Sequence, residues 1–96
     1  MNKYECLYIL APDLAEDVRE GLINKFSDMV TKAGGTVDGI DRWGNKHLAY
    51  EINFKHEGYY VLMNFTASAT TPKEIESLMH ITDGVMRCMF VRKDKL

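Results

Sequence analysis

Four stretches of the chain alternate hydrophobic and polar residues or are rich in aromatic and β-branched residues, a pattern that predicts β-strands. We expect these strands at residues 3–10, 36–54, 59–67 and 85–92. The second strand should be interrupted near Gly44-Asn45, and residues 55–58 should form the turn that leads into the third.

Two further segments carry apolar residues at helical spacing. The first helix is expected to start at Asp13, with Glu16 at the capping-box position, and to end at Gly34-Gly35. Its apolar stripe should consist of Leu14, Val18, Leu22, Phe26, Met29, Val30 and Ala33. The second helix is expected to start in the segment Thr71-Pro72-Lys73-Glu74, with Thr71 as its cap, and to end before Asp83.

The predicted element order is therefore βαββαβ, in a single domain that spans residues 1–96. Two helices cannot cover both faces of a four-stranded sheet, so both should pack on the same face. The expected fold is α+β, a two-layer ferredoxin-like sandwich whose antiparallel sheet has the first and third strands at its centre. The other face of the sheet is left open to solvent or to a partner.

The alternation of side chains along a strand assigns residues to these two faces. The helix-facing set should be Cys6, Tyr8, Leu10, Tyr59, Val61, Met63, Phe65, Ala67, Met86, Cys88 and Phe90. The open face should carry Glu5, Leu7, Ile9, Tyr60, Leu62, Asn64, Arg87, Met89 and Val91. Single apolar residues are common on surfaces, but a cluster on adjacent strands usually marks an interface, and we favour an interface here.

The segment from Asp41 to Asn53 predicts a hairpin arm that projects from the sheet. It contains the only tryptophan, Trp43, then a flexible Gly-Asn step, Lys46, His47 and the strand-like run Leu48-Ala49-Tyr50. Nothing in it resembles a catalytic motif, so contact with another molecule is the favoured interpretation. Trp43 could equally be a packing anchor at a bend of the strand.

Charge and cysteine content restrict the possible functions. The formal net charge is −2, whereas a protein that binds nucleic acid alone by electrostatics should be clearly basic. The longest uncharged apolar stretch, Cys6 to Pro12, is too short to cross a membrane, and the first residues do not resemble a secretory signal. The two cysteines, Cys6 and Cys88, fit reduced thiols of a cytosolic protein better than a disulfide framework.

Arg87 and Glu5 are expected on neighbouring strands of the open face, and this pair has two interpretations. The two side chains could form an ordinary cross-strand ion pair. Alternatively, Arg87 could join Lys3, Arg92 and Lys93 in a cationic strip along one sheet edge, suited to phosphates. The residues alone leave both interpretations open.

Motifs for catalysis or metal binding are not found in the sequence. There is no glycine-rich phosphate loop, and His47, His56 and His80 sit on separate elements without ligand spacing. We therefore expect no enzyme activity, no cofactor and no metal.

Three protein classes share this element order, so the fold alone does not decide function. An RNA-recognition module needs aromatic side chains on the open face of the first and third strands, but alternation buries Tyr8. An acylphosphatase-like enzyme needs a phosphate-binding loop after the first strand, for which Ala11-Pro12-Asp13 is unsuited. A small-ligand regulatory domain leaves no clear trace and stays open.

The whole chain closely resembles the bacterial family of small-subunit ribosomal protein six. The most specific match is Trp43-Gly44 followed by Leu48-Ala49-Tyr50-Glu51-Ile52. Further matches are Lys3-Tyr4-Glu5, Gly58-Tyr59-Tyr60, Val85-Met86-Arg87 and Phe90-Val91. Where the family has an N-terminal arginine, this chain has Asn2-Lys3, which keeps one charge but loses the planar fork that grips phosphate in two places.

The resemblance implies a structural protein of the cytoplasmic ribosome, without cofactor, metal or membrane. It implies binding to the central domain of 16S ribosomal RNA as a heterodimer with ribosomal protein eighteen of the small subunit. On this basis we expect contacts to RNA from Lys3, Arg87, Arg92 and Lys93. Contacts to the partner protein are expected from Leu7, Ile9, Leu48, Ala49, Tyr50, Tyr60 and Leu62. An RNA-recognition-like or small-ligand regulatory module is the alternative.

Overall fold

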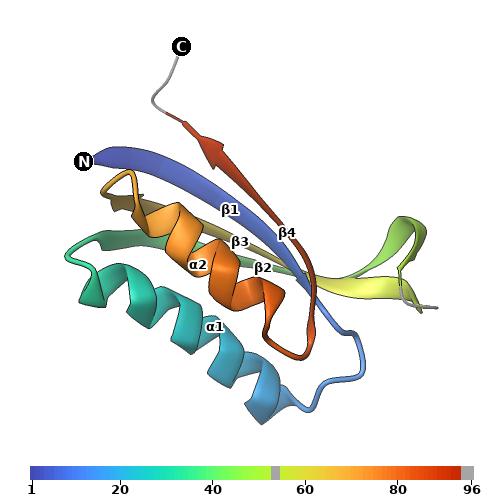
Figure 1. Ribbon diagram of the computed structural model, residues 1–96. Coiled ribbons are helices and arrows are strands. Elements are labelled where there is room, and N and C mark those ends of the chain that lie inside the picture. The colour runs from blue at the N-terminus through green and yellow to red at the C-terminus, as the bar shows by residue number, and fades with distance from the viewer. Residues whose placement is uncertain (53–54, 94–96) are drawn as a thin grey trace.

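The computed structural model describes residues 1–52 and 55–93, except for the side chain of Ala49. Its elements are β1 (Asn2–Leu10), α1 (Glu16–Lys32), β2 (Thr36–Ile52), β3 (Lys55–Ala67), α2 (Thr71–His80) and β4 (Val85–Arg92). The strands form one antiparallel sheet in the order β2-β3-β1-β4, and both helices cover the same face of it (Figure 1). The predicted α+β, ferredoxin-like fold with β1 and β3 at its centre is confirmed.

The hydrophobic core lies between the helices and the sheet. Its fully buried side chains come from alternate positions of the central strands and from both helices: Cys6, Tyr8, Leu10, Val61, Met63, Phe65, Ala67, Ile23, Phe26, Val30, Ile75 and Met79. The faces predicted for β1 and β3 are therefore confirmed. In β4 an irregularity pairs Leu10 with Val85, so that Val85 packs against the core in place of Met86.

The buried line of α1 differs from the predicted stripe. Val18 is 49% exposed, whereas Ile23, which was not assigned to the stripe, is fully buried. The fully buried residues of α1 are Ile23, Phe26 and Val30, and the half-buried Arg19 continues this line toward the start of the helix. Arg19 is charged and was therefore not assigned to the apolar stripe. Its guanidinium lies 4.3 Å from the ring centroid of Tyr59, so the methylene groups of its side chain cover part of the core.

The predicted side-chain caps are wrong at both helix starts. The N-cap of α1 is Ala15, without a side-chain hydrogen bond, and Asp13 instead pairs with Lys55 at 3.3 Å between Oδ2 and Nζ. The N-cap of α2 is Thr70 rather than Thr71, again without a side-chain bond. The glycine end of α1 is confirmed, because Gly34 has φ +85° and the next N–H bonds back to the Val30 carbonyl at 2.9 Å.

The long strands β2 and β3 continue past the end of β1 as a projecting hairpin, here called the arm: residues 45–52 and 55–58 (Figure 1). The interruption expected at Gly44-Asn45 is a β-bulge within a continuous strand, where Trp43 is the extra residue and Gly44 has φ +84°. The turn predicted at residues 55–58 is wrong, because these residues belong to β3, and Lys55, Glu57 and Gly58 pair with residues of β2. Asn53 and Phe54, expected in the second strand, lie outside the described residues.

No helix of the described part of the chain has the length and apolar character needed to cross a bilayer.

The Tyr8 hydroxyl is fully buried and has no hydrogen-bond partner among the described residues. Tyr8→Phe is therefore expected to raise the free energy of unfolding by about 1 kcal/mol, because it removes an unsatisfied polar group. Tyr4→Phe is the matched control. The Tyr4 hydroxyl accepts a hydrogen bond from Asn2 Nδ2 at 3.2 Å, so removal of this hydroxyl should lower the free energy of unfolding. Urea unfolding of both variants measures this, and equal destabilisation by the two changes would contradict it.

Gly58 lies where the base of the arm meets β1. A Cβ atom built there would be 2.3 Å from Ile9 Cγ2, which cannot swing away because isoleucine is branched at Cβ. Gly58→Ala should therefore lower the free energy of unfolding by about 1–3 kcal/mol through overpacking. Gly39→Ala, in open space in the same sheet, should be nearly neutral, and equal effects on the urea midpoint would refute the close-approach explanation.

Candidate functional site

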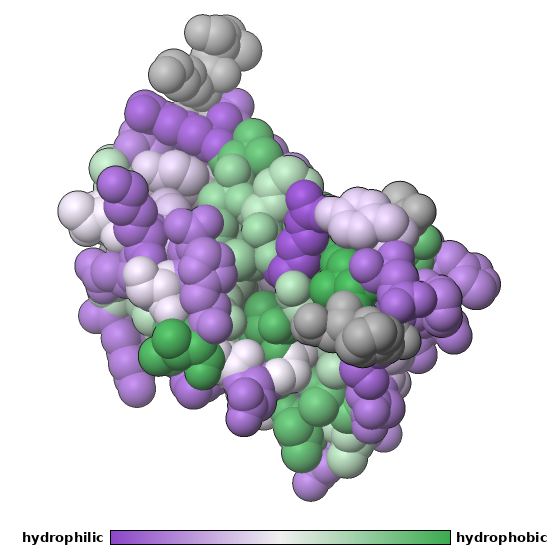
Figure 2. Space-filling view, turned by 45° about the vertical axis from the view of Figure 1, so that its right-hand side comes forward, coloured by the Kyte–Doolittle hydropathy of each residue, from purple (hydrophilic) through white to green (hydrophobic). Residues whose placement is uncertain are grey.

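The sheet face that the helices leave uncovered carries apolar side chains on three adjacent strands. The register places Leu7 of β1 between Leu62 of β3 and Met89 of β4. Met89 and Val91 are each 50% exposed. Figure 2 shows hydrophobic surface between the hydrophilic residues at its left and the arm at its right. We call the set Leu7, Ile9, Tyr60, Leu62, Met89 and Val91 the open-face patch.

A pocket of about 220 Å³ indents this patch near the arm. Its lining is Leu7, Ile9, Tyr60, Arg87, Cys88 and Met89. Ile9 forms its floor rather than its surface, since only 8% of this residue is exposed where Gly58 packs against it. The pocket therefore offers an apolar hollow with one cation at its rim.

Trp43 extends the patch toward the edge strand β2. Its ring stacks on that of Tyr60, with centroids 6.3 Å apart and planes at 11°, and 43% of the residue is exposed. The bulge turns this side chain onto the open face, which agrees with a packing anchor at a bend of the strand. Trp43 was not among the predicted contact residues, nor were Met89 and Val91, although alternation along β4 pointed to the latter two.

Arg87 and Tyr50 connect the two edges of the sheet. Arg87 Nη1 donates a hydrogen bond to the Tyr50 hydroxyl, and its guanidinium carbon lies 5.7 Å from the ring centroid. Arg87 stands opposite Ile9, whereas Glu5 stands opposite Val91, so Arg87 and Glu5 are not the cross-strand neighbours that an ion pair would need. Arg87 is instead held by Tyr50 of the arm.

The arm residues differ in exposure. Leu48 is half-buried and Tyr50 is 59% exposed, whereas the side chain of Ala49 lies outside the described part of the chain. His56 Nε2 is 3.3 Å from Glu51 Oε2, which makes an ion pair when the histidine is protonated. The arm thus presents an aromatic, mixed-charge surface rather than a strongly basic one.

The other predicted cations do not form one strip with Arg87. Lys93 donates its backbone N–H to the Lys3 carbonyl at 2.8 Å and its ammonium group to Asn64 Oδ1 at 3.1 Å. Lys93 follows Arg87 by six positions, which is about 20 Å along an extended chain. The structure therefore brings Lys3 and Lys93 together at one end of the open face and leaves Arg87 at the other.

Arg92 belongs to the helix side of the sheet. It stands opposite Tyr4, which faces the core, and its Nη2 donates to Asn2 Oδ1 at 3.0 Å. It therefore lies at the same end of the sheet as Lys3 and Lys93 but projects from the other face.

The aromatic display of an RNA-recognition module is not formed by β1 and β3. Tyr8 is fully buried with its ring edge-on to Phe26, and Tyr59 lies on the helix side under Arg19. Tyr60, in contrast to Tyr8 and Tyr59, faces the open side, where the ring of Trp43 stacks on it. Base stacking on these two strands is therefore not the chemistry that this sheet offers.

Both cysteines are free thiols, Cys6 buried and Cys88 half-buried. Burial, above all, raises the pKa of the Cys6 thiol, and the neighbouring Cys88 adds to the effect. Burial likewise raises the pKa of Cys88, followed by the charge of Glu76. Burial therefore favours the neutral thiol form of both cysteines over the reactive thiolate.

Comparison with known proteins gives a consistent result over nearly the full chain. Residues 3–92 match the family model of ribosomal protein S6. The small ribosomal subunit protein bS6 of Caldanaerobacter subterraneus subsp. tengcongensis is 47% identical over 94 residues, which cover 98% of this chain and 99% of that protein. The protein of the same name from Clostridium novyi is 47% identical over 95 residues, covering 99% and 100%.

The fold also agrees with a solved structure. The crystal structure of 30S ribosomal protein S6 from Thermotoga maritima superposes with a TM-score of 0.90 at 28% identity. The match covers 96% of this chain and 87% of that one.

Proposed function

The chain belongs to the ribosomal protein S6 family, and from this premise we propose that it binds the central domain of 16S ribosomal RNA as one half of a heterodimer with ribosomal protein eighteen. In this role it is a structural protein of the small ribosomal subunit, in the bacterial cytoplasm, and it has no catalytic step to perform.

The observation that carries the proposal is the open-face patch. Apolar side chains on three neighbouring strands are exposed together, with a hollow of about 220 Å³ between them. Contiguous apolar surface of this kind is typical of a protein–protein interface, whose centre is apolar and whose rim is polar. We propose that Leu7, Tyr60 and Leu62 form its centre and that Ile9 supports them from below.

The arm is proposed as the second part of the partner surface. Leu48, Ala49 and Tyr50 lie on its β2 strand, and the bond from Arg87 fixes Tyr50 beside the patch. A preformed arm does not have to be ordered on binding, which lowers the entropic cost of docking.

The charge of the chain supports division of labour between the two proteins. With a net charge of −2, this chain can release few counterions from RNA, so a basic partner has to supply most of the electrostatic affinity. Lys3, Lys93 and Arg92 at one end of the sheet, and Arg87 at the other, are proposed to reach separate phosphates. Their contacts would orient the heterodimer on the RNA rather than provide most of its affinity.

The proposed function predicts that RNA binding depends on the partner. In gel-shift titrations with a central-domain RNA fragment, this chain alone should bind weakly, and addition of ribosomal protein eighteen should lower the apparent Kd at least about a hundredfold, which corresponds to about 2.7 kcal/mol. Tight binding by this chain alone, unchanged by the partner, would exclude the scaffold role.

One substitution tests the docking face in the same assay. Met89→Asp places a charge in the patch and should raise the Kd of the heterodimer by at least about tenfold, or about 1.4 kcal/mol. Val18→Asp is the matched control, because Val18 is exposed to a similar degree, 49% against 50%, but lies on α1. Equal effects of the two variants would place the partner elsewhere.

Arg87 already contacts Tyr50, and we predict that it also contacts a phosphate of the RNA. Arg87→Ala should weaken binding of the heterodimer to RNA and reduce the slope of log K against log salt by about one. Lys25→Ala, which removes an exposed cation from α1, should leave the slope unchanged. An unaltered slope for Arg87→Ala, with normal heterodimer formation, would restrict Arg87 to holding the arm.

A further inference from the structure

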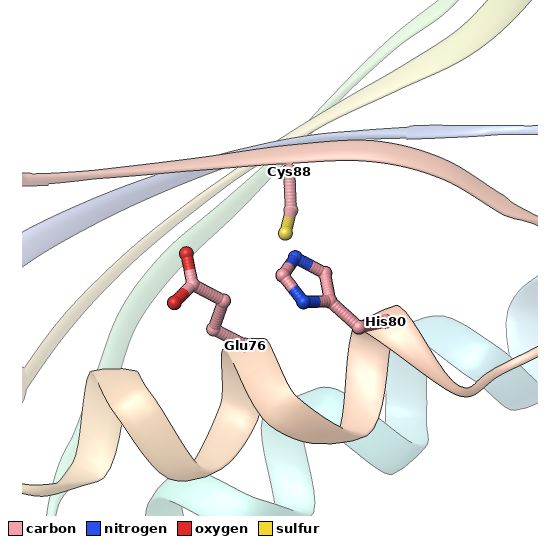
Figure 3. Close-up of side chains that lie close together, drawn as sticks. All are labelled: Glu76, His80 and Cys88. Atoms are coloured by element: carbon pink, nitrogen blue, oxygen red, sulfur yellow. The ribbon is translucent and has the colours of Figure 1, made fainter.

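Three side chains that can bind metal ions converge between α2 and β4 (Figure 3). Glu76 and His80 are four residues apart on α2 and therefore share one face of the helix. Cys88 points toward them from β4. One carboxylate oxygen, one imidazole nitrogen and the Cys88 sulfur all lie within 4.8 Å of one another.

We propose that Glu76, His80 and Cys88 form a binding site for a transition-metal ion, for which Zn²⁺ is the best match. Zinc takes thiolate, imidazole and carboxylate ligands together, whereas Mg²⁺ and Ca²⁺ prefer oxygen ligands alone. Three protein ligands leave a fourth tetrahedral position for a water molecule or for a group from another molecule.

The geometry needs only a small contraction to hold the ion. Zinc lies about 2.3 Å from sulfur and about 2.0–2.1 Å from nitrogen or oxygen, so tetrahedral ligand atoms are about 3.5 Å apart. The present separations of up to 4.8 Å therefore have to close by about 1 Å or a little more. His80 is exposed and Glu76 is half-buried, so their side chains can rotate without repacking the core.

The electrostatic setting favours a cation at this position. His80 is the last residue of α2, where the aligned peptide dipoles give the helix end a partial negative charge. On binding, the Cys88 thiol loses its proton to solvent and the sulfur bonds to the metal. The resulting thiolate and the Glu76 carboxylate balance the double positive charge of the ion.

Solvent can reach this site. A pocket of about 240 Å³ opens beside it, with His80 and Cys88 in its lining. An ion with its waters can therefore enter without unfolding of α2 or β4.

Cobalt provides a direct spectroscopic test with the reduced protein of residues 1–96. Titration with Co²⁺ should produce the visible bands of a four-coordinate ion and a near-ultraviolet thiolate-to-cobalt band, saturating at one ion per chain. Zn²⁺ should then displace cobalt and abolish both features. Octahedral Co²⁺ without a thiolate band would overturn the proposal.

Substitutions identify the ligands. His80→Ala, Glu76→Gln and Cys88→Ser should each raise the Kd for Co²⁺ by at least about tenfold. Loss of a residue that merely hydrogen-bonds to a metal ligand already lowers metal affinity about 10- to 100-fold. His56→Ala is the matched control and should leave the Kd for Co²⁺ unchanged. His56 also has a glutamate beside it, Glu51 at 3.3 Å, but it belongs to the arm.

His80→Ala decides the outcome, because an exposed side chain can be removed without unfolding the protein, which circular dichroism verifies. An unchanged Kd in His80→Ala, or a thiolate band that survives in Cys88→Ser, would overturn the assignment.

Discussion

The structure depends on one constraint: two helices supply apolar cover for only one face of a four-stranded sheet. The covered face of β1 and β3 holds the fully buried core, from Cys6 and Tyr8 to Met63 and Phe65. The intervening side chains of the same strands have no helix above them, yet several are equally apolar. The core and the open-face patch therefore both result from the alternation of side chains along these strands, and no helix of the described part of the chain covers the patch.

The layer order and the two faces could be predicted because alternation is a local property of the sequence. Residues such as Leu7 and Leu62 were assigned to the open side from position alone, and the register agrees. Local irregularities could not be predicted in the same way. The bulge at Trp43 and the shift that puts Val85 in the place of Met86 depend on how two strands fit together, which neither strand specifies alone.

The parts of the candidate site that depend on side-chain contacts between distant segments could not be predicted from the sequence. Arg87 and Tyr50 are 37 positions apart, and their contact requires the arm to reach across to the far edge of the sheet. Glu76, His80 and Cys88 come from a helix and a strand, so their spacing in the sequence carries no metal-site pattern. The prediction of the first helix cap failed for another reason. Asp13 has a side chain that can cap a helix, but in the structure it forms an ion pair with Lys55 instead.

The position of β4 has a consequence for the order of events in the cell. Residues 85–92 follow the other three strands along the chain and are therefore synthesised after them, and they contribute Met89 and Val91 to the open-face patch. Until they are made, β1 has an unpaired edge and the patch lacks one of its three strands. If the proposed partner recognises the patch of all three strands, it would thus bind weakly to chains in which β4 has not yet been made.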